Sequence, residues 1–260
     1  MSGAKTVLVV GLGEVGRPIL ELVGRRQRAV GLDVAPPAEP IEHVDVMHVC
    51  YPFEINDFIG QTDRYIHRFK PSLTIINSTV GVGTTRAVAE RSGTPVVHSP
   101  VRGKHIRMVQ ELLHYTKFVG ATDVAAGQQA AAHFESLGMK TRVLSSPEAT
   151  ELAKLMETTY FGLMIAWAQD IERYCDQLGQ DYDEVVALFE EVGFFPPVKY
   201  FPGFIGGHCI MPNIEILSRV HHSEILKAIQ SSNRKKAERD ALRGQARASA
   251  RPGSPATKAG

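Results

Sequence analysis

The sequence has little of what marks proteins that bind nucleic acid or span membranes. Its 29 basic and 28 acidic residues leave a net charge of +1, so no strong field draws the chain to nucleic acid or to an anionic membrane. The longest apolar run, residues 160–168, is about half as long as a membrane span, and no N-terminal signal peptide is recognisable. These absences favour a globular cytoplasmic protein that binds neither nucleic acid nor membrane.

Cysteine is scarce as well. The three cysteines, Cys50, Cys175 and Cys209, are odd in number, widely spaced and without the spacing of metal ligands. Such a set is typical of reduced thiols in the cytoplasm, and it predicts neither a disulfide framework nor a metal site. Apolar residues, by contrast, make up 43% of the 260 residues, which is enough to build the cores of one or two domains.

A glycine-rich motif directly follows the first predicted strand. Residues 5–10 are an apolar run of strand length, and the next six residues are Gly11-Leu12-Gly13-Glu14-Val15-Gly16. Glycines at this spacing permit a tight turn, close approach of the backbone to a pyrophosphate and close packing of the following helix. A second predicted strand, 28–32, ends in Asp33, where a carboxylate can bind ribose hydroxyls and repel a 2′-phosphate. The motif therefore predicts an NAD site; the alternative is a cluster of turn glycines with an unrelated Asp33.

Strands and helices alternate up to residue 144, in the pattern of a doubly wound α/β sheet. Further strands are predicted over 44–49, 73–77, 95–99, 117–120 and 140–144, and helices over 56–69, 82–91 and 125–137. Ser78 and Thr79 follow one of these strands, at the edge where such sheets bind ligands, although both also suit helix caps or turns. We assign residues 1–145 to a Rossmann-type NAD-binding domain.

The composition becomes helical beyond residue 145. Ser146-Pro147-Glu148 is typical of a helix start, and this helix can continue to Leu178, before Gly179. Its middle is apolar nearly all round, so we expect it to be covered by a second copy of the chain, in a homodimer built on residues 146–178. Lys154 and Thr158 lie on one face of this helix, where the lysine is either a surface side chain or a charged group of a site.

An irregular segment of about twenty residues leads to Cys209. Gly206 and Gly207 allow close approach of a ligand to the backbone, and Asn213 is predicted to cap a helix over 214–220. Cys209 would then lie just before a helix N-terminus, which favours the thiolate. It is either a nucleophile or an unreactive thiol in a loop rich in glycine and proline.

Two more helices and a tail complete the predicted domains. A short helix is expected from Asp181 towards Gly193 and a longer one over 223–242. We assign residues 146–243 to a helical dimerisation and catalytic domain. Residues 244–260 have the composition of a disordered tail.

Five motifs in this order resemble the UDP-glucose/GDP-mannose dehydrogenase family. They are the glycine motif within residues 9–18, Ser78-Thr79-Val80 with Gly83-Thr84-Thr85, Ser99-Pro100, Glu151-Leu152-Ala153-Lys154 and Gly206-Gly207-His208-Cys209. The resemblance covers about residues 5–240. It implies a Rossmann domain followed by an all-helical, 6-phosphogluconate-dehydrogenase-like dimerisation domain, and we interpret the chain as a shortened form without the family's third, nucleotide-sugar-binding domain.

The resemblance also implies a chemistry. Members of the family oxidise a primary alcohol twice with NAD, through an intermediate covalently bound to a cysteine. By matching positions, Cys209 is the nucleophile, Lys154 stabilises the oxygen that becomes charged, and Thr79 orients water or substrate.

Several positions depart from the family pattern. The family's Asn and Asp, four residues after its Lys and its Cys, are Thr158 and Asn213 here. Val101 replaces a glutamate, with His105 near the place of a second acid, and Phe161 replaces an arginine. We therefore expect hydride transfer to persist while hydrolysis and sugar recognition are altered, so that UDP-glucose and GDP-mannose are not turned over. The alternatives are a non-catalytic NAD-binding or partner subunit and a single two-electron dehydrogenase or reductase.

Overall fold

The computed structural model describes residues 5–34, 41, 43–102, 107–192, 201–207, 209–220 and 222–249. The chain forms two compact units, Met1–Met156 and Glu157–Gly260, called here the N-terminal and the C-terminal unit. The division falls inside one long helix, α6 (Pro147–Leu178), which begins where the sequence predicts it. The predicted domain boundary at residue 145 is thus close to, but not at, the division between the units.

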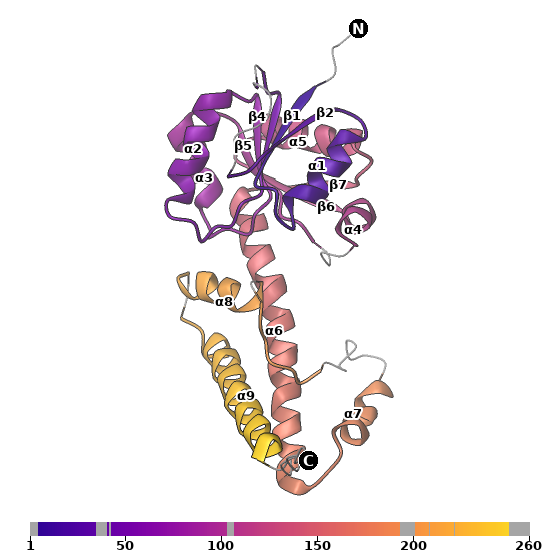
Figure 1. Ribbon diagram of the computed structural model, residues 1–260. Coiled ribbons are helices and arrows are strands. Elements are labelled where there is room, and N and C mark those ends of the chain that lie inside the picture. Colours follow the sequence, from indigo (N-terminus) through magenta and orange to yellow (C-terminus); the bar gives the residue numbers. More distant parts are fainter. Residues whose placement is uncertain are drawn as a thin grey trace, which may run out of the picture. The chain divides into compact units, whose positions relative to one another are not determined.

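A seven-stranded sheet forms the centre of the N-terminal unit (Figure 1). Its strands, in the order β2-β1-β3-β4-β5-β6-β7, are parallel except that β6 runs antiparallel to β5. Every predicted strand is present: β1 (Thr6–Val10), β2 (Arg28–Leu32), β3 (Val46–Val49), β4 (Leu73–Ile76), β5 (Val96–His98), β6 (Lys117–Ala121) and β7 (Thr141–Leu144). The central strands β1, β3, β4 and β5 are short, largely apolar and buried runs because helices cover both faces of the sheet.

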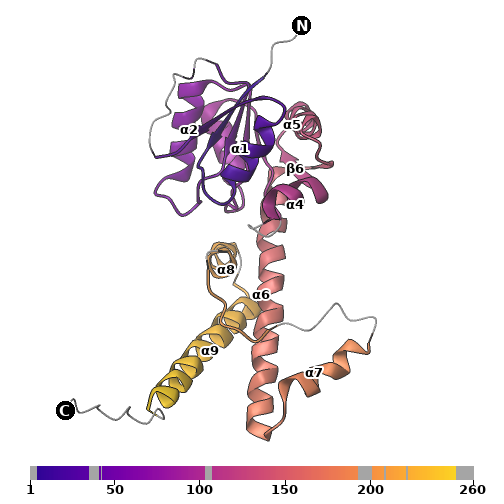
Figure 2. The same ribbon diagram turned by 45° about the vertical axis from the view of Figure 1, so that its right-hand side comes forward.

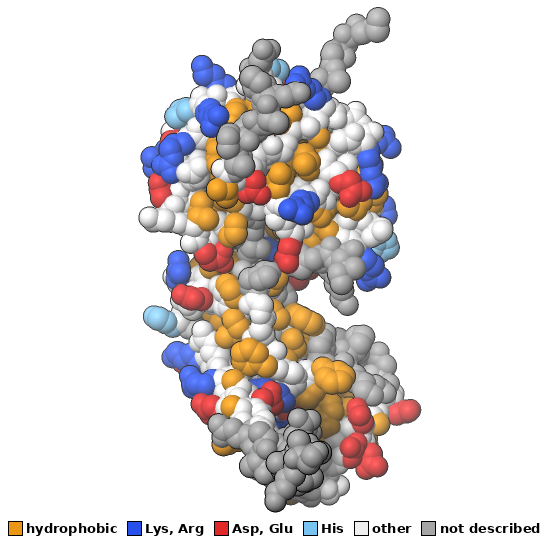
Figure 3. Space-filling model, in the orientation of Figure 1, with side chains coloured by type: hydrophobic (Ala, Val, Ile, Leu, Met, Phe, Trp, Pro, Cys, Tyr) orange, Lys and Arg blue, Asp and Glu red, His pale blue; other side chains and the backbone are white. Residues whose placement is uncertain are grey.

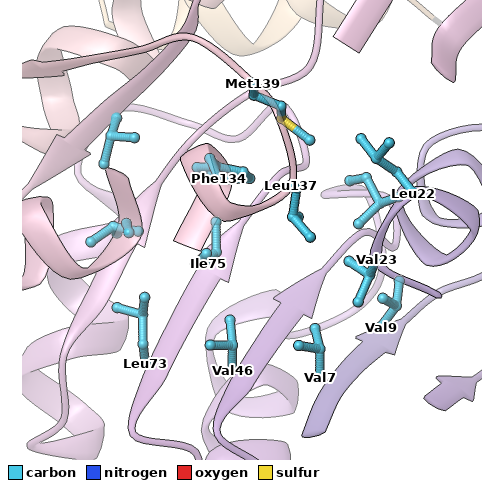
Figure 4. Packing of buried hydrophobic residues seen from close by; sticks show 14 of the residues in the cluster. Val7, Val9, Leu22, Val23, Val46, Leu73, Ile75, Phe134, Leu137 and Met139 are labelled. Atoms are coloured by element: carbon cyan, nitrogen blue, oxygen red, sulfur yellow. The ribbon is translucent and has the colours of Figure 1, made fainter. Parts of the chain in front are cut away.

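Alternate residues of the strands supply two separate cores. Val7 and Val9 of β1 pack with α1 (Gly16–Gly24), α4 (Met108–His114) and α5 (Val124–Ser136), whereas Leu8 and Val10 pack with α2 (Phe58–Phe69) and α3 (Thr84–Ser92). Figure 4 shows the first core, where Phe134 of α5 lies over Ile75 of β4. The sheet is thereby a three-layer α/β/α sandwich, the Rossmann-type architecture predicted from the sequence.

Helix α4 was not predicted. It is only seven residues long, and of its four apolar residues Met108 and Leu112 are buried in the first core, whereas Val109 and Leu113 are partly buried against it. Seven residues make only about two helical turns, which is too short a run to distinguish a helix from a loop by periodicity.

The C-terminal unit is helical. Beside the rest of α6 lie α8 (Ile210–Ser218) and α9 (Glu224–Ser249), and α7 (Tyr182–Glu190) follows α6 in the chain (Figure 2). Lys236 of α9 makes an ion pair of 2.9 Å with Glu172 of α6. None of the helices in the described part of the chain has the length and apolar content of a membrane span.

Two predictions about these helices are wrong in detail. α8 begins at Ile210 rather than at Ile214, so Asn213 is not the cap but a buried residue of the first turns. Pro212 is tolerated there because the first N–H groups of a helix have no partner within it. α9 continues beyond Leu242 to Ser249, since alanine and arginine favour helix. The tail predicted from residue 244 thus begins inside this helix, and residues 250–260 lie outside the described residues.

Candidate functional site

The glycine motif forms a tight turn between β1 and α1. Gly11 has φ +88°, and a side chain there would bring Cβ within 2.7 Å of the Tyr51 amide nitrogen. A Cβ on Gly16 would lie 1.7 Å from the Gly11 carbonyl oxygen. Gly13, in contrast, faces open space, with no atom within 4 Å of the position of a Cβ. Two of the glycines thus make the turn possible, and the third leaves an open surface beside the N-terminus of α1.

Asp33 lies next to this turn. Its Oδ2 accepts a hydrogen bond of 3.2 Å from the Leu12 amide, and its Oδ1 accepts one of 2.9 Å from the Val34 amide. The two amides orient an exposed carboxylate whose oxygens can each accept a further hydrogen bond. The exposed Glu14 and the N-cap residue of α1, Val15, complete the motif.

Ser78 and Thr79 follow β4, but Ser78 has a structural role. Its Oγ donates a hydrogen bond of 2.6 Å to the Tyr51 carbonyl, and its own carbonyl accepts one of 3.1 Å from His98 Nε2. Burial lowers the pKa of His98 to about 3, so its ring is neutral and carries the proton on Nε2. His98 Nδ1 lies 2.8 Å from Thr150 Oγ1 of α6. The helix α6 thereby fixes the segment that presents the half-buried Thr79.

A buried carboxylate, which the sequence analysis did not assign to the site, also joins α6 to the Rossmann-type domain. Glu151 of α6 accepts hydrogen bonds from the Gly83 and Thr85 amides, at 2.7 and 2.8 Å, and so caps α3 from outside that helix. It is fully buried, which raises its pKa, although the two amides act in the opposite direction. Glu151 is the first residue of the motif Glu151-Leu152-Ala153-Lys154, so the sequence contained a signal for it. Lys154 lies half-buried one turn further along α6.

Cys209 occupies the N-cap position of α8. It is exposed, whereas Cys50 and Cys175 are buried, and burial raises the pKa of Cys50 to about 12. In the same unit Asn213 Nδ2 donates a hydrogen bond of 3.1 Å to Thr158 Oγ1, which joins α8 to α6. The structure therefore brings together the two residues at which the sequence departs from the family's Asp and Asn.

The remaining predicted residues fall into separate groups. Gly11, Leu12, Gly13, Glu14, Val15, Gly16 and Asp33 form one cluster of the N-terminal unit, and that unit also contains Ser78, Thr79 and Lys154. Thr158, Cys209 and Asn213 belong to the C-terminal unit. His105 lies outside the described residues.

The chain is similar to proteins of known family. Residues 148–235 match the model of the central domain of the UDP-glucose/GDP-mannose dehydrogenase family. A UDP-N-acetyl-D-mannosamine dehydrogenase from Methanocaldococcus jannaschii is 26% identical over 185 residues, which are 65% of this chain and 43% of that protein. The enzyme of the same name from Pyrococcus horikoshii is 30% identical over 151 residues, or 54% of this chain and 35% of that protein. The chain thus spans less than two thirds of the length of these relatives.

Solved structures share the fold. A UDP-D-ManNAc dehydrogenase from Pyrococcus horikoshii superimposes with a TM-score of 0.78 at 20% identity, over 91% of this chain and 69% of that one. A 3-hydroxyisobutyrate dehydrogenase from Mycobacterium tuberculosis gives a TM-score of 0.69 at 17% identity, over 92% of this chain and 94% of that one. These likenesses confirm a Rossmann-type domain followed by a helical domain. With the family model and the sequence relatives taken together, the chain is similar to dehydrogenases of the UDP-glucose/GDP-mannose dehydrogenase family, and the match to the family model lies in residues 148–235.

Proposed function

We propose that the protein is an NAD-dependent oxidoreductase that oxidises an alcohol or aldehyde through an intermediate bound to Cys209. The observation that carries this proposal is the exposed thiol of Cys209 at the N-cap of α8, in a chain that also has an open glycine turn beside Asp33. The relatives named above are dehydrogenases, which supports the same class of reaction.

The residues of the glycine turn fit NAD. The open side of Gly13 and the first amides of α1 would accept the pyrophosphate, and Asp33 would accept hydrogen bonds from the ribose hydroxyls. NAD, when bound, supplies the acceptor for the hydride that leaves the substrate. Because the Asp33 carboxylate repels a 2′-phosphate, NAD should bind at least about tenfold more tightly than NADP, a difference of about 1.4 kcal/mol. Calorimetric titration with both dinucleotides measures this ratio, and equal affinities would remove the argument from Asp33.

Three side chains of the protein would carry out the other steps of the reaction. Cys209 Sγ would add to the carbonyl carbon of the aldehyde, forming a carbon–sulfur bond, and Lys154 would stabilise the oxygen that gains charge. Thr79 would orient the substrate or the attacking water. Loss of hydride from the thiohemiacetal leaves a thioester on Cys209, which water or another nucleophile must cleave.

Cleavage of that thioester should be slow. Thr158 and Asn213 bond to each other and neither side chain can act as a base at neutral pH, and Val101 is apolar. Loss of a general base typically lowers a rate by about 10²–10⁴-fold. The acyl group should therefore accumulate on Cys209 or pass to a stronger nucleophile such as an amine.

The test is NADH formation by the purified chain with a panel of alcohols that includes sugar nucleotides and short hydroxy acids. Intact-protein mass spectrometry after reaction should show an acyl adduct that Cys209→Ser abolishes. UDP-glucose and GDP-mannose should give no steady NADH formation, because Phe161 replaces a cation of the family's pattern. If Cys209→Ser retains full NADH formation without any adduct, Cys209 is not a nucleophile.

A single two-electron dehydrogenase is the second candidate. The observation that favours it is that the fold covers 94% of a chain named 3-hydroxyisobutyrate dehydrogenase, whereas it covers 69% of the UDP-D-ManNAc dehydrogenase chain. One NADH per substrate molecule identifies this candidate and two identify the first. A non-catalytic subunit would bind NAD and form no NADH with any substrate of the panel.

The protein should be a homodimer built on α6. Large apolar side chains of this helix are partly exposed in the single chain; in the C-terminal unit they are Tyr160, Phe161, Trp167, Tyr174 and Leu178. Figure 3 shows hydrophobic side chains on the surface of this unit. A row of exposed aromatic residues favours a protein–protein interface. The cytoplasmic location expected from the sequence stays a prediction.

A further inference from the structure

Two buried amide side chains hold the segment that leads to Cys209. Residues 201–207 form no helix or strand. Asn233 of α9, which is 4% exposed, nevertheless accepts a hydrogen bond of 2.7 Å from the Ile205 amide and donates one of 3.0 Å to the Ile205 carbonyl. A single side chain thus bonds both backbone groups of Ile205, as a neighbouring strand would.

The second amide supports the first. Gln169 of α6 is fully buried, and its Nε2 donates to the Gly203 carbonyl at 2.7 Å and to Asn233 Oδ1 at 3.4 Å. Its Oε1 accepts from Ser232 Oγ at 2.9 Å. Because both ends of Gln169 and both ends of Asn233 have partners, neither amide can turn without breaking a buried hydrogen bond.

The chain beyond Cys209 is fixed against the same helix. A Cβ on Gly162 of α6 would lie 2.7 Å from Ile210 Cγ2, so the first residue of α8 packs directly on the backbone of α6. The bond between Asn213 and Thr158 secures the next turn of α8. Cys209 therefore lies between a segment held by Asn233 and Gln169 and a helix start held by α6.

We propose that Asn233, supported by Gln169, is a positioning residue that keeps the Cys209 thiol at the N-terminus of α8 and so sets its reactivity. The partial positive charge of a helix N-terminus acts only within about one turn, so a small displacement of the thiol removes it. The proposal deepens the function proposed above, since it assumes that reactivity of Cys209 is what the site needs.

The experiment is alkylation of the 260-residue chain by iodoacetamide, with each cysteine followed by peptide mass spectrometry from pH 6 to pH 9.5. Asn233→Ala should slow alkylation of Cys209 at neutral pH by about threefold or more, because a smaller fraction of the thiol is ionised. At the alkaline end, where the thiol ionises in either protein, the two rates should converge. Cys50 and Cys175 are buried and report whether the variant has unfolded.

Lys236→Ala is the matched control. Lys236 lies one turn from Asn233 on α9 and makes ion pairs with Glu172 of α6 and with Asp240 of α9. Neither of these partners belongs to the segment 201–207. The control should lower the melting temperature and leave the pH profile of Cys209 unchanged. If Asn233→Ala also leaves that profile unchanged, the proposal is overturned.

A second variant and a separate activity assay distinguish unfolding of Asn233→Ala, failure of the positioning role and failure of the proposed function. If Asn233→Ala exposes Cys50 and Cys175, Gln169→Leu takes its place and must shift the profile in the same direction. This change removes the bonds of Gln169 to Gly203, Asn233 and Ser232 and keeps both bonds of Asn233 to Ile205. NADH formation by the wild-type protein is measured separately. Its absence would contradict the proposed function while the effect of Asn233 on alkylation still stands, and an active enzyme with an unaltered profile in both variants would contradict only the positioning role.

Discussion

At the scale of single residues, Gly13 and Gly16 allow a test that separates cofactor binding from folding. Gly16→Ala places a methyl group against the backbone carbonyl of Gly11, which cannot move aside as a flexible side chain could. The change should destabilise the protein by about 1–3 kcal/mol. Gly13→Ala meets no atom of the protein, so the melting temperature should stay near that of wild type while NAD affinity falls. Thermal melts with and without NAD check both. A normal affinity in Gly13→Ala would show that the dinucleotide does not approach this glycine.

Buried histidines should make the protein sensitive to acid. His48 Nδ1 accepts from Asn77, which leaves its Nε2–H to donate to His133 Nε2 at 2.9 Å, and both rings are neutral. Burial lowers the pKa of His133 to about 4 and that of His98 to about 3, and it lowers the pKa of His48 well below its usual value. The charges of Lys117 and Lys154 also disfavour a proton on His98.

Because the pKa values of these histidines are lower in the folded chain than in the unfolded chain, the protein should lose stability as the pH falls. Below about pH 6.5 these histidines bind protons in the unfolded chain but stay neutral in the folded chain. The free energy of unfolding therefore falls as the pH falls towards the pKa values of the histidines in the folded chain. His98 and His133 should each cost about 2 kcal/mol between pH 7 and pH 5. Urea denaturation at the two pH values measures the loss. His133→Gln should reduce this loss and the same change at the exposed His222 should not; a stability independent of pH over this window would contradict the assignment.

At the scale of secondary structure elements, helix α3 depends on a cap supplied by another helix. Glu151→Gln replaces one carboxylate oxygen by a donor that faces a backbone amide, so a buried N–H loses its partner and stability should fall by about 2–3 kcal/mol. Glu148→Gln, on the same face of α6, only weakens an exposed ion pair with Arg86 and should cost about 1 kcal/mol or less. Equal losses in the two variants, measured by urea denaturation, would argue against the capping role.

Much of this fold could be predicted from the sequence because its elements carry strong local signals. Most strands are short apolar runs next to glycine or polar residues, and α6 has a serine cap, a proline in its first turn and a glycine after its end. The start of α8 could not be predicted, because Ile210 is helical through its packing on Gly162 rather than through a cap. The hydrogen bonds of Glu151 and Asn233 join residues more than 25 positions apart, so no local sequence pattern predicts them.

At the scale of the whole molecule, the apolar side chains of α6 predict the oligomeric state. Light scattering at micromolar concentration should give the mass of a dimer, and Trp167→Glu, at a side chain 48% exposed, should give a monomer that still binds NAD. Leu188→Glu, at the exposed Leu188 of α7, is the control and should remain dimeric. A monomeric wild-type protein would contradict the dimer and leave the exposed aromatic residues of α6 without an explanation.

Gly162 makes α6 a frustrated helix, in which local preference and tertiary packing oppose each other. Glycine weakens a helix interior by about 1 kcal/mol relative to alanine, so Gly162→Ala should raise the helicity of an isolated peptide of residues 147–178. In the folded chain the same methyl group would meet Ile210, and the protein should lose stability as the peptide gains helix. Circular dichroism of the peptide and thermal melting of the protein would then shift in opposite directions. A position with this property resists improvement by helix propensity alone, because the space left by the missing side chain is what allows α8, and Cys209 with it, to begin where it does.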